Sequence, residues 1–400
     1  MTDVVVQSAV RLPIGRFRGA LKDIHTARLG ETVARAAIER AGIDPAEIDE
    51  VVMSETYRGD LPGCSARPVA LRAGVPLATP GVNLNMHCGS GLKALVVASQ
   101  MIRAGDAEVV LVVAMESMSR AVYFLRGARS GFGLGHATLV DQLVQKGDPA
   151  RDPAVDPTAA LSMGETAERL AEKYQISRTR QDEYALRSQR AAGRALAERR
   201  FEGQVVPIEV SSGKTAITFS VDEHPRPETT LEVLAKLPPV FKPGGTVTAG
   251  NSSGMNDGAA ALLLMSAERA RSLGREPLGR LRGHASVGVL PEEMGLGPVP
   301  ATQKLLARTA FALTDFKLIE LNEAFAAQVL ACLDEYAELA RLSDRINVNG
   351  SGISLGHPIG ATGGILAVKL VHELRRTGGG LGLATMCVGG GQGIALALEV

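Results

Sequence analysis

The chain repeats one order of elements in its two halves, and this repeat restricts the possible folds more than any other feature. In the first half, a helical stretch over residues 27–41 precedes a strand-like run at 48–53. In the second half, a helical stretch near 305–308 precedes a strand-like run at 318–321, which ends at Asn322. Because strands and helices alternate in the same order twice, the sequence predicts duplicated α/β units with helices covering the sheets.

A glycine-rich bend follows in each half. Residues 85–91 read Asn-Met-His-Cys-Gly-Ser-Gly, and residues 347–352 read Asn-Val-Asn-Gly-Ser-Gly. After each bend the pattern predicts an apolar helix and then a strand, at 109–114 in the first half and 381–386 in the second. Between the halves, residues 120–249 have a different texture and are expected to form an insertion that packs on the main body.

Composition excludes several classes of function. Lys+Arg and Asp+Glu are equal at 43 each, so no net field attracts nucleic acid or an anionic membrane. Trp is absent and aromatic residues make up 4%, which disfavours base stacking. There is no basic segment followed by an apolar one at the N-terminus, and no run of about 18 apolar residues, so we expect a cytoplasmic protein without a membrane span.

The four cysteines are spread along the chain without a CxxC pair, at positions 64, 88, 332 and 387. This spacing fits neither a zinc site nor a disulfide framework and indicates a reducing compartment. Cys88 stands at a glycine-rich bend before an apolar helix. Unpaired N–H groups and the dipole of such a helix favour a thiolate, so the sequence predicts a lowered pKa and a nucleophile. A buried structural cysteine at a turn is the alternative.

Three further stretches carry possible chemistry. Asn322 follows a strand, His357 lies on a Gly/Pro bend before a helix, and Cys387 ends a strand before a glycine run. An imidazole can take the proton of a thiol, a second cysteine can serve as acid or base, and backbone N–H groups of glycine runs can hold an oxyanion. Taken singly, each residue has a structural alternative: a turn histidine, a core cysteine and a helix-capping asparagine.

Four motifs occur together in an order and spacing that resemble the thiolase family. They are Asn-x-x-Cys-Gly-Ser-Gly at 85–91, Asn-Glu-Ala-Phe at 322–325, Gly-His-Pro-x-Gly-Ala-Thr-Gly at 356–363 and Cys-x-Gly-Gly-Gly-x-Gly at 387–393. A further match at 247–258 extends the resemblance over essentially the whole chain. One such motif alone is weak evidence, whereas four together are highly specific.

The resemblance implies the thiolase fold, an α/β architecture of two duplicated α/β domains in a five-layered αβαβα arrangement with an inserted loop domain. The N-terminal domain, which carries Cys88, would comprise residues 1–119 and 246–270. The loop domain would comprise 120–245, and the C-terminal domain 271–400. Family members are commonly dimers or tetramers, so a homo-oligomer is expected.

By matching motif positions, the resemblance implies roles for five residues. Cys88 would carry the acyl group as a thioester, His357 would take its proton, and Cys387 would exchange the proton at the α-carbon of acetyl-CoA. Asn322 and His357 would hold a water or donor for one thioester oxygen. The backbone N–H groups of Cys88 and Gly389 would form a second oxyanion hole. No permanent cofactor and no metal is expected, since coenzyme A and acyl-CoA would be substrates.

The resemblance also places coenzyme A along the loop domain, with contacts from seven residues. Ser253 and Ala249 match positions near the pantetheine, Arg226 matches one near the nucleotide, and the pocket-lining positions are Met163, Phe241, Met294 and Phe325. Without the resemblance, Arg226 reads as an exposed arginine, and the Met and Phe residues read as core.

The implied activity is that of a reversible acyltransferase. It would cleave 3-ketoacyl-CoA with CoA to acetyl-CoA and a shortened acyl-CoA, as in fatty-acid β-oxidation, or condense two acetyl-CoA to acetoacetyl-CoA. Short-chain biosynthetic members often carry His-Met-Gly where residues 162–164 read Ser-Met-Gly. Longer-chain or β-ketoadipyl-type specificity therefore stays open.

Two rival functions remain at this point. A decarboxylating condensing enzyme of the same fold typically uses Cys-His-His or Cys-His-Asn, which a cysteine at position 387 disfavours. A non-catalytic CoA- or lipid-binding homologue is expected to have lost Cys88, His357 or Cys387, and all three are present.

Overall fold

The computed structural model describes residues 2–400 except 60–62, 145–153, 155 and 213–214. The strands of its main sheet are β1 (Val4–Arg11), β2 (Gly15–Arg16), β3 (Glu50–Ser54), β4 (Gly81–Leu84), β5 (Val109–Ser117), β10 (Asn256–Ser266), β11 (Gly279–Gly288), β12 (Phe316–Leu321), β13 (Leu381–Val388) and β14 (Gln392–Glu399). The α-helices are α1 (Thr26–Ala41), α2 (Ala66–Arg72), α3 (Ser90–Ala104), α4 (Met163–Lys173), α5 (Arg178–Ala197), α6 (Leu231–Ala235), α7 (Ala267–Ser272), α8 (Pro298–Thr309), α9 (Ala326–Glu335), α10 (Ala337–Ala340), α11 (Gly352–Leu355) and α12 (Ile359–Arg376).

The sheet contains the predicted repeat. Its order is β12-β13-β14-β11-β1-β10-β5-β3-β4, with β2 paired to β10. Read outward from the centre, β1-β10-β5-β3 matches β11-β14-β13-β12: in each half the first three strands pair antiparallel and the fourth pairs parallel. The halves meet where β1 and β11 pair over Val5–Arg280 and Val6–Gly279. The predicted duplication is therefore confirmed.

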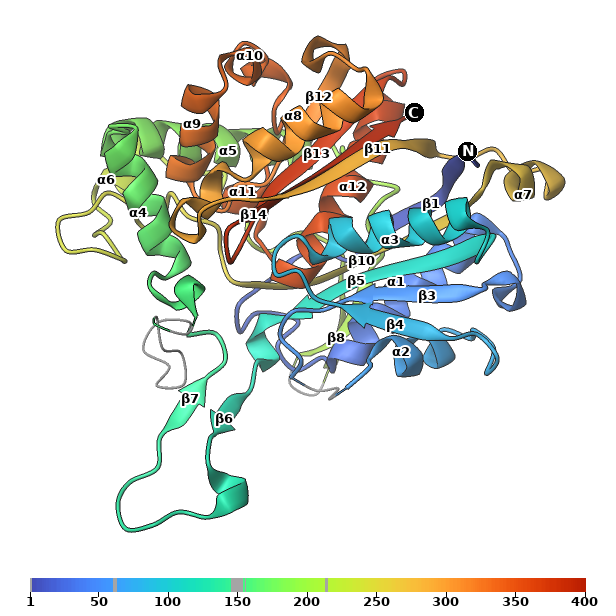
Figure 1. Cartoon of the computed structure of the whole chain (residues 1–400), viewed down its shortest axis with the longest axis horizontal. Helices are drawn as coiled ribbons and strands as arrows, with labels where there is room; N and C mark the ends of the chain where they lie inside the picture. The colour runs from blue at the N-terminus through green and yellow to red at the C-terminus, as the bar shows by residue number, and fades with distance from the viewer. Residues whose placement is uncertain (1, 60–62, 145–153, 155, 213–214) are drawn as a thin grey trace.

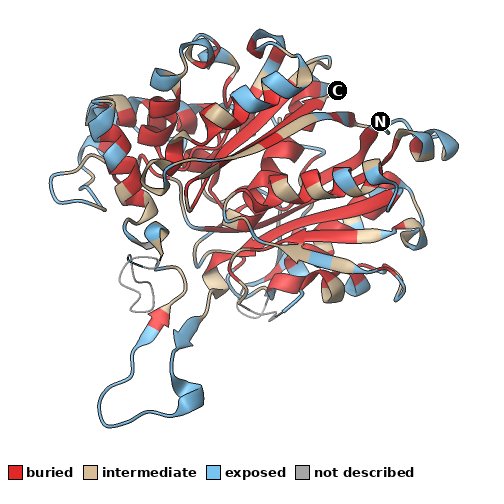
Figure 2. Cartoon of the chain, in the orientation of Figure 1, coloured by how far each residue is buried: buried red, intermediate tan, exposed pale blue. Residues whose placement is uncertain are grey.

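The helices divide into outer and shared layers (Figure 1). Side chains alternate across a strand, so each strand serves two cores. In β5, Val110 and Val112 share one cluster with α3 and α12, whereas Leu111 and Val113 share another with α1 and α2. In β13, Leu383 belongs to a third cluster together with α8 and α9. Helices α3 and α12 thus lie between the two half-sheets, and the central strands β1, β5 and β10 are buried along their whole length (Figure 2).

Element boundaries follow the sequence pattern where apolar periodicity is strong. Helix α1 ends at Gly42, which adopts the left-handed conformation with φ 64°, as a glycine C-cap does. Strand β5 continues to Ser117, beyond the predicted 109–114, because its ladder with β10 continues and Glu116 finds backbone donors. The run of apolar residues in β5 ends before the strand does, because the backbone hydrogen bonds to β10 continue to Ser117.

The segment between the halves adds α4, α5 and two hairpins. A hairpin follows α5 and consists of β8 (Ile208–Ser212) and β9 (Thr215–Phe219). Among the described residues of 121–160, the strands form one short pair, β6 (Tyr123–Leu125) and β7 (Leu139–Asp141). This pair and its connection extend away from the body (Figure 1). No helix in the described part of the chain is long and apolar enough to cross a membrane.

Candidate active site

Cys88 lies on the turn between β4 and α3 and is half-buried. The backbone N–H groups of Gly389 and of Cys88 itself both point at its sulfur and favour the thiolate. Burial has the larger effect and raises the pKa of Cys88 to about 11, and the nearby Glu116 carboxylate raises it further. The resting side chain is therefore a thiol.

This result corrects the predicted lowering of the Cys88 pKa. Helix α3 begins at Ser90, so Cys88 precedes the helix and does not lie in its first turn. Two N–H groups of the turn are already used, because Gly89 donates to the Met86 carbonyl at 3.0 Å and Ser90 donates to the His87 carbonyl at 3.1 Å. Desolvation of the anion therefore outweighs the remaining donors.

His357 is 5% exposed and lies on the bend before α12. Its Nδ1 is 2.6 Å from the Thr362 hydroxyl oxygen, and its backbone N–H donates to Asn256 Oδ1 at 3.0 Å. Nε2 is buried without a hydrogen-bond partner among the described residues. Burial lowers the pKa of His357 to about 4, so at neutral pH the imidazole is uncharged and able to accept a proton.

Asn322 directly follows β12 and is fully buried. Neither its Oδ1 nor its Nδ2 has a partner within the described residues, which is unusual because buried amides are normally satisfied. The helix-cap alternative does not account for these two free atoms. Cys387, near the end of β13, is 1% exposed. Burial raises the pKa of Cys387 well above its usual range, and a negative charge on Cys88 would raise it further.

The two halves bring these residues together through close backbone contacts. A Cβ on Gly89 would lie 2.7 Å from Val388 Cγ2, so the Cys88 turn packs on the end of β13. A Cβ on Gly363 would lie 2.3 Å from the backbone nitrogen of Leu92, so the first turns of α3 and α12 touch. Cys88, His357 and Cys387 thus lie on elements around one contact between the half-sheets.

The predicted pocket residues lie partly beside this site. A Cβ on Gly389 would be 3.4 Å from Met163 Sδ. Phe241 and Phe325 form an edge-to-face pair with ring centroids 5.9 Å apart, and Met294 is buried in the same cluster. This arrangement fits an apolar wall near the cysteines, and it also agrees with the core alternative.

The other predicted coenzyme A contacts are more exposed. Ser253 is half-buried and its N–H donates to the Ala324 carbonyl at 2.9 Å, whereas Ala249 is exposed on the same turn. Arg226 is exposed, and its N–H is held by Gln189 Oε1 at 2.8 Å. The segment of Arg226 approaches this turn, because a Cβ on Gly254 would lie 2.2 Å from His224 Cε1.

Three residues around the site were not predicted to have a role. Thr362 and Asn256 hold His357, and both stand inside quoted motifs. Glu116, fully buried in β5, accepts N–H groups from Thr56 at 3.1 Å, Tyr57 at 3.1 Å and Gly360 at 2.8 Å. Burial raises the pKa of Glu116 to about 8. An acidic residue continuing an apolar strand was the available signal for it.

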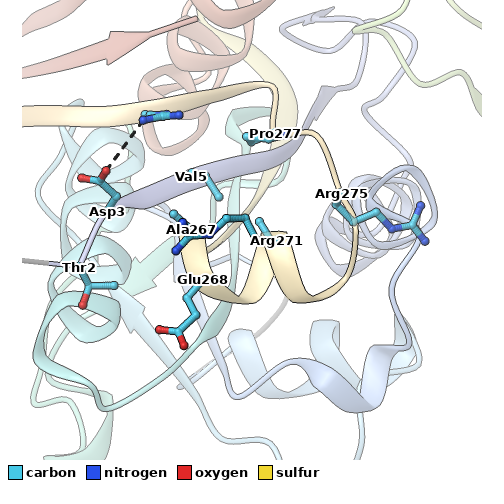
Figure 3. A pocket seen from close by; sticks show the side chains of 10 residues that line it. Thr2, Asp3, Val5, Ala267, Glu268, Arg271, Arg275 and Pro277 are labelled. Carbon is cyan, nitrogen blue, oxygen red and sulfur yellow. Dashed lines mark ion pairs between the residues drawn. The ribbon is translucent and has the colours of Figure 1, made fainter.

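Two surface cavities lie away from the predicted site residues. One of about 390 Å³ is lined by residues of β1, α7 and β11, with Arg271, Arg275 and Glu268 around it (Figure 3). Another of about 450 Å³ lies between the end of α5 and Asp222. Neither contains a predicted site residue. Across the described residues, no group of three or more His, Cys, Asp or Glu side chains is arranged to hold a metal ion.

Known proteins resemble this chain along its whole length. It is 46% identical over 401 residues to an acetyl-CoA acetyltransferase of Pseudomonas aeruginosa, with 100% of this chain and 99% of that protein covered. An acetyl-CoA acetyltransferase structure from Bacillus anthracis has a TM-score of 0.93 at 44% identity and covers 100% of this chain and 99% of its own. Human mitochondrial 3-ketoacyl-CoA thiolase has a TM-score of 0.93 at 42% identity, with 100% and 98% covered.

Family comparison gives the same result for each half. Residues 4–268 match the thiolase N-terminal domain, and residues 275–400 match the thiolase C-terminal domain. With its repeated half-sheets and full-length relatives, the chain belongs to the thiolase family.

Proposed function

We propose that this protein is a thiolase in which Cys88 forms the acyl-enzyme. The observation that carries the proposal is a set of buried polar atoms without partners: His357 Nε2 and both side-chain polar atoms of Asn322 lack partners among the described residues. Since such groups normally bind something, they fit a site that receives a polar substrate atom. The names of the relatives support the same chemistry.

In the cleavage direction, the first step is attack on the 3-keto carbon. A thiol with a pKa of about 11 is ionised to only about one part in ten thousand at pH 7, so a base must remove the proton as the sulfur attacks. His357 Nε2 is assigned this role. The N–H groups of Cys88 and Gly389 would stabilise the oxyanion that forms on the keto oxygen.

The second step breaks the bond between C2 and C3. The electrons of that bond pass to acetyl-CoA as an enolate, whose thioester oxygen would be stabilised by Asn322 and His357. Cys387 would give its proton to the α-carbon. Its raised pKa suits this task, because the side chain is protonated at neutral pH and becomes an acid only toward a strongly basic carbanion. The thiol of CoA then attacks the Cys88 thioester, with its proton passing to the Cys387 thiolate. The Cys88 thiolate leaves as the new acyl-CoA forms and takes back the proton held by His357.

Coenzyme A is proposed to lie along the loop domain, residues 120–245. The two thiolase domains are proposed to comprise residues 1–119 with 246–270, and residues 271–400. Ser253 and Ala249 would face the pantetheine and Arg226 the nucleotide, since the Arg226 segment packs beside the Ser253 turn. The structure of the human relative in complex with CoA supports the class of substrate.

One observation favours acyl groups longer than acetyl. A cavity of about 180 Å³ lies beside the 389–391 turn, where a Cβ on Gly390 would be 3.7 Å from Thr158 Cγ2. Its volume is several times the roughly 30 Å³ that one water takes in the liquid. Most of its lining is apolar, comprising Pro157, Thr158, Ala160, Leu161, Thr166, Leu290, Pro291 and Glu292. We therefore assign it the alkyl part of a longer 3-ketoacyl-CoA.

The decisive experiment is steady-state thiolysis of 3-ketoacyl-CoA from four to sixteen carbons with wild type, Cys88→Ser and, as a matched control, Cys64→Ser. Cys64 is exposed, and its Sγ lies within hydrogen-bond distance of the Gly81 carbonyl and of Asn83 Oδ1. Loss of activity by roughly 10³-fold or more in Cys88→Ser alone is expected, because a serine hydroxyl is a far weaker nucleophile. No wild-type turnover on any chain length, with CoA still bound, would leave a binding protein as the explanation.

The protruding hairpin supports a homo-oligomer. Six of its large apolar side chains are exposed: Tyr123, Phe124, Leu125, Phe132, Leu134 and Leu139 (Figure 2). Exposed apolar clusters of this kind mark association surfaces. Sedimentation equilibrium will separate dimer from tetramer. A reducing, cytoplasmic setting is proposed because all four cysteines are unpaired.

A further inference from the structure

The Thr362 hydroxyl lies between two possible acceptors of its single proton, the His357 ring and the Pro358 carbonyl. Its oxygen is 2.6 Å from His357 Nδ1 and 2.9 Å from the Pro358 carbonyl oxygen. The carbonyl can only accept, so the single hydroxyl proton goes to Pro358. The hydroxyl oxygen then offers its lone pair to His357, which requires the proton of the neutral ring to sit on Nδ1.

The backbone around His357 is held from the other half of the molecule. Asn256, fully buried at the start of β10, accepts the His357 N–H at 3.0 Å and donates to the Gly15 carbonyl at 2.9 Å. Gly356 has φ 103°, and a Cβ there would lie 2.5 Å from Asn256 Cγ, so the bend presses directly on this amide. The backbone of this bend is thus fixed, and the ring itself is held by the contact of Nδ1 with Thr362.

The first turn of α12 is held equally firmly. Gly360 donates to Glu116 Oε2 at 2.8 Å, and its carbonyl accepts the Ser54 hydroxyl at 2.9 Å. Thr362 lies in this turn, so β3 and β5 together set the position of its hydroxyl relative to the ring. Thr362 is therefore held in a fixed frame rather than free to change rotamer.

From this geometry we propose that Thr362 is a positioning residue that locks His357 in the Nδ1–H tautomer and directs the lone pair of Nε2 into the site. The inference rests on the proposed function for its consequence, because only this tautomer can take the proton of Cys88. Nε2 is the ring atom without a partner among the described residues, as an atom reserved for a transient proton should be.

The test compares Thr362→Val, which keeps the shape but removes the hydroxyl, with Thr362→Ser, which keeps the hydroxyl. In Thr362→Val, Nδ1–H is left buried without an acceptor, and the proton can move to Nε2. Thiolysis kcat is expected to fall roughly 10- to 100-fold, within the range for an impaired general base, with KM for CoA within about 2-fold. Thr362→Ser is expected to restore kcat to within about 3-fold. Equal kcat in wild type and Thr362→Val would overturn the proposal.

Two readouts separate this proposal from the proposed function. In a Cys64→Ser background, iodoacetamide labelling of Cys88, mapped by mass spectrometry, should slow by the same factor in Thr362→Val without any substrate present. Nitrogen-15 NMR of histidine-labelled wild-type protein should show His357 protonated at Nδ1. An Nε2–H signal would refute the tautomer even if the valine variant failed to fold. Slowed labelling in a protein without thiolysis would refute only the proposed function.

Discussion

Cys88 and His357 are both uncharged in the resting site, and this sets the pH range in which a proton can pass between them. Burial raises the pKa of Cys88 to about 11 and lowers that of His357 to about 4. Between these values Cys88 is a thiol and His357 is a neutral imidazole. Because burial destabilises both the thiolate and the imidazolium, the Cys88–His357 ion pair is expected to form only with substrate present, when the acyl oxygen takes up the negative charge.

The acid limb of activity should accordingly lie well below the usual pKa of histidine. His357 accepts the thiol proton only when neutral, so kcat/KM for thiolysis is expected to stay high down to about pH 5 and to fall near pH 4. A midpoint near 6.5 would contradict this account. Kinetics should be initial rates from pH 4 to 8, with circular dichroism at each pH to separate loss of activity from unfolding.

The same shift affects folding stability, and the sign follows from proton uptake. The folded pKa of His357 lies below the unfolded value of about 6.5, so the unfolded chain binds the proton first as pH falls. This group therefore lowers stability progressively from about pH 6.5 to 4. Glu116 acts in the opposite sense: its folded pKa of about 8 lies above the unfolded value, so its contribution declines as pH rises toward 8.

At the scale of elements, the contact between α3 and α12 holds the Cys88 turn beside the His357 bend. This contact is close because Gly91 and Gly363 lack side chains: a Cβ on Gly91 would lie 2.4 Å from the Gly364 nitrogen. Backbone atoms cannot give way as a flexible side chain can. The separation of α3 and α12 is therefore set by backbone contact, and this contact fixes the position of the Cys88 turn relative to the His357 bend.

Gly363→Ala should separate these helices. A Cβ would lie 2.3 Å from the Leu92 nitrogen, and overpacking of this kind costs about 1–3 kcal/mol. The expected result is a fall of a few degrees in Tm together with reduced kcat, measured by thermal denaturation and thiolysis. Gly133→Ala is the matched control, since no described atom lies within 4 Å of its Cβ position. A Gly363→Ala protein as stable and active as the control would disprove the importance of the contact.

The sequence anticipated elements where one periodicity dominates and missed them where tertiary contacts decide. Helix α1 matches the predicted 27–41 within a residue. Helix α8 begins at Pro298, well before the recognised stretch at 305–308, because its first turns bury Val299 and Ala301 against the sheet beside prolines that mask the helical pattern. Proline is compatible with a first helical turn, where its missing N–H has no helical partner.

At the scale of the whole molecule, a buried ion pair joins β1 to the inserted segment. Asp222 accepts from both terminal nitrogens of Arg11, at 2.7 and 2.9 Å, and from the Ile14 N–H at 2.8 Å. Gln204 Oε1 accepts from Arg11 Nε at 2.9 Å, so the guanidinium is well satisfied. Both side chains are almost completely buried. Removing one charge therefore leaves the other in a medium of low polarity.

Asp222→Asn is expected to lower the free energy of unfolding by about 3–5 kcal/mol, because the buried guanidinium loses its counter-charge. Asp334→Asn, which breaks the more exposed pair with Arg180, should cost no more than about 1 kcal/mol. Denaturant titration of both variants provides the measurement. Equal effects of the two substitutions would show that burial does not determine the strength of the Arg11 pair.

The linear sequence determined the family and the candidate site residues Cys88, Asn322, His357 and Cys387, because these follow from local motifs. It also determined the duplicated α/β architecture, because the periodicity of the elements repeats in the two halves. Only the tertiary structure decided the protonation of Cys88, His357 and Cys387. The position of Cys88 before an apolar helix predicted a lowered pKa, whereas burial in the folded chain raises it. The burial of these side chains and the role of Asn256 depend on residues that are distant in sequence. The orientation of the His357 ring and the role of Thr362 depend on which atoms within one motif contact each other. Such relations exist only once the two halves have packed together.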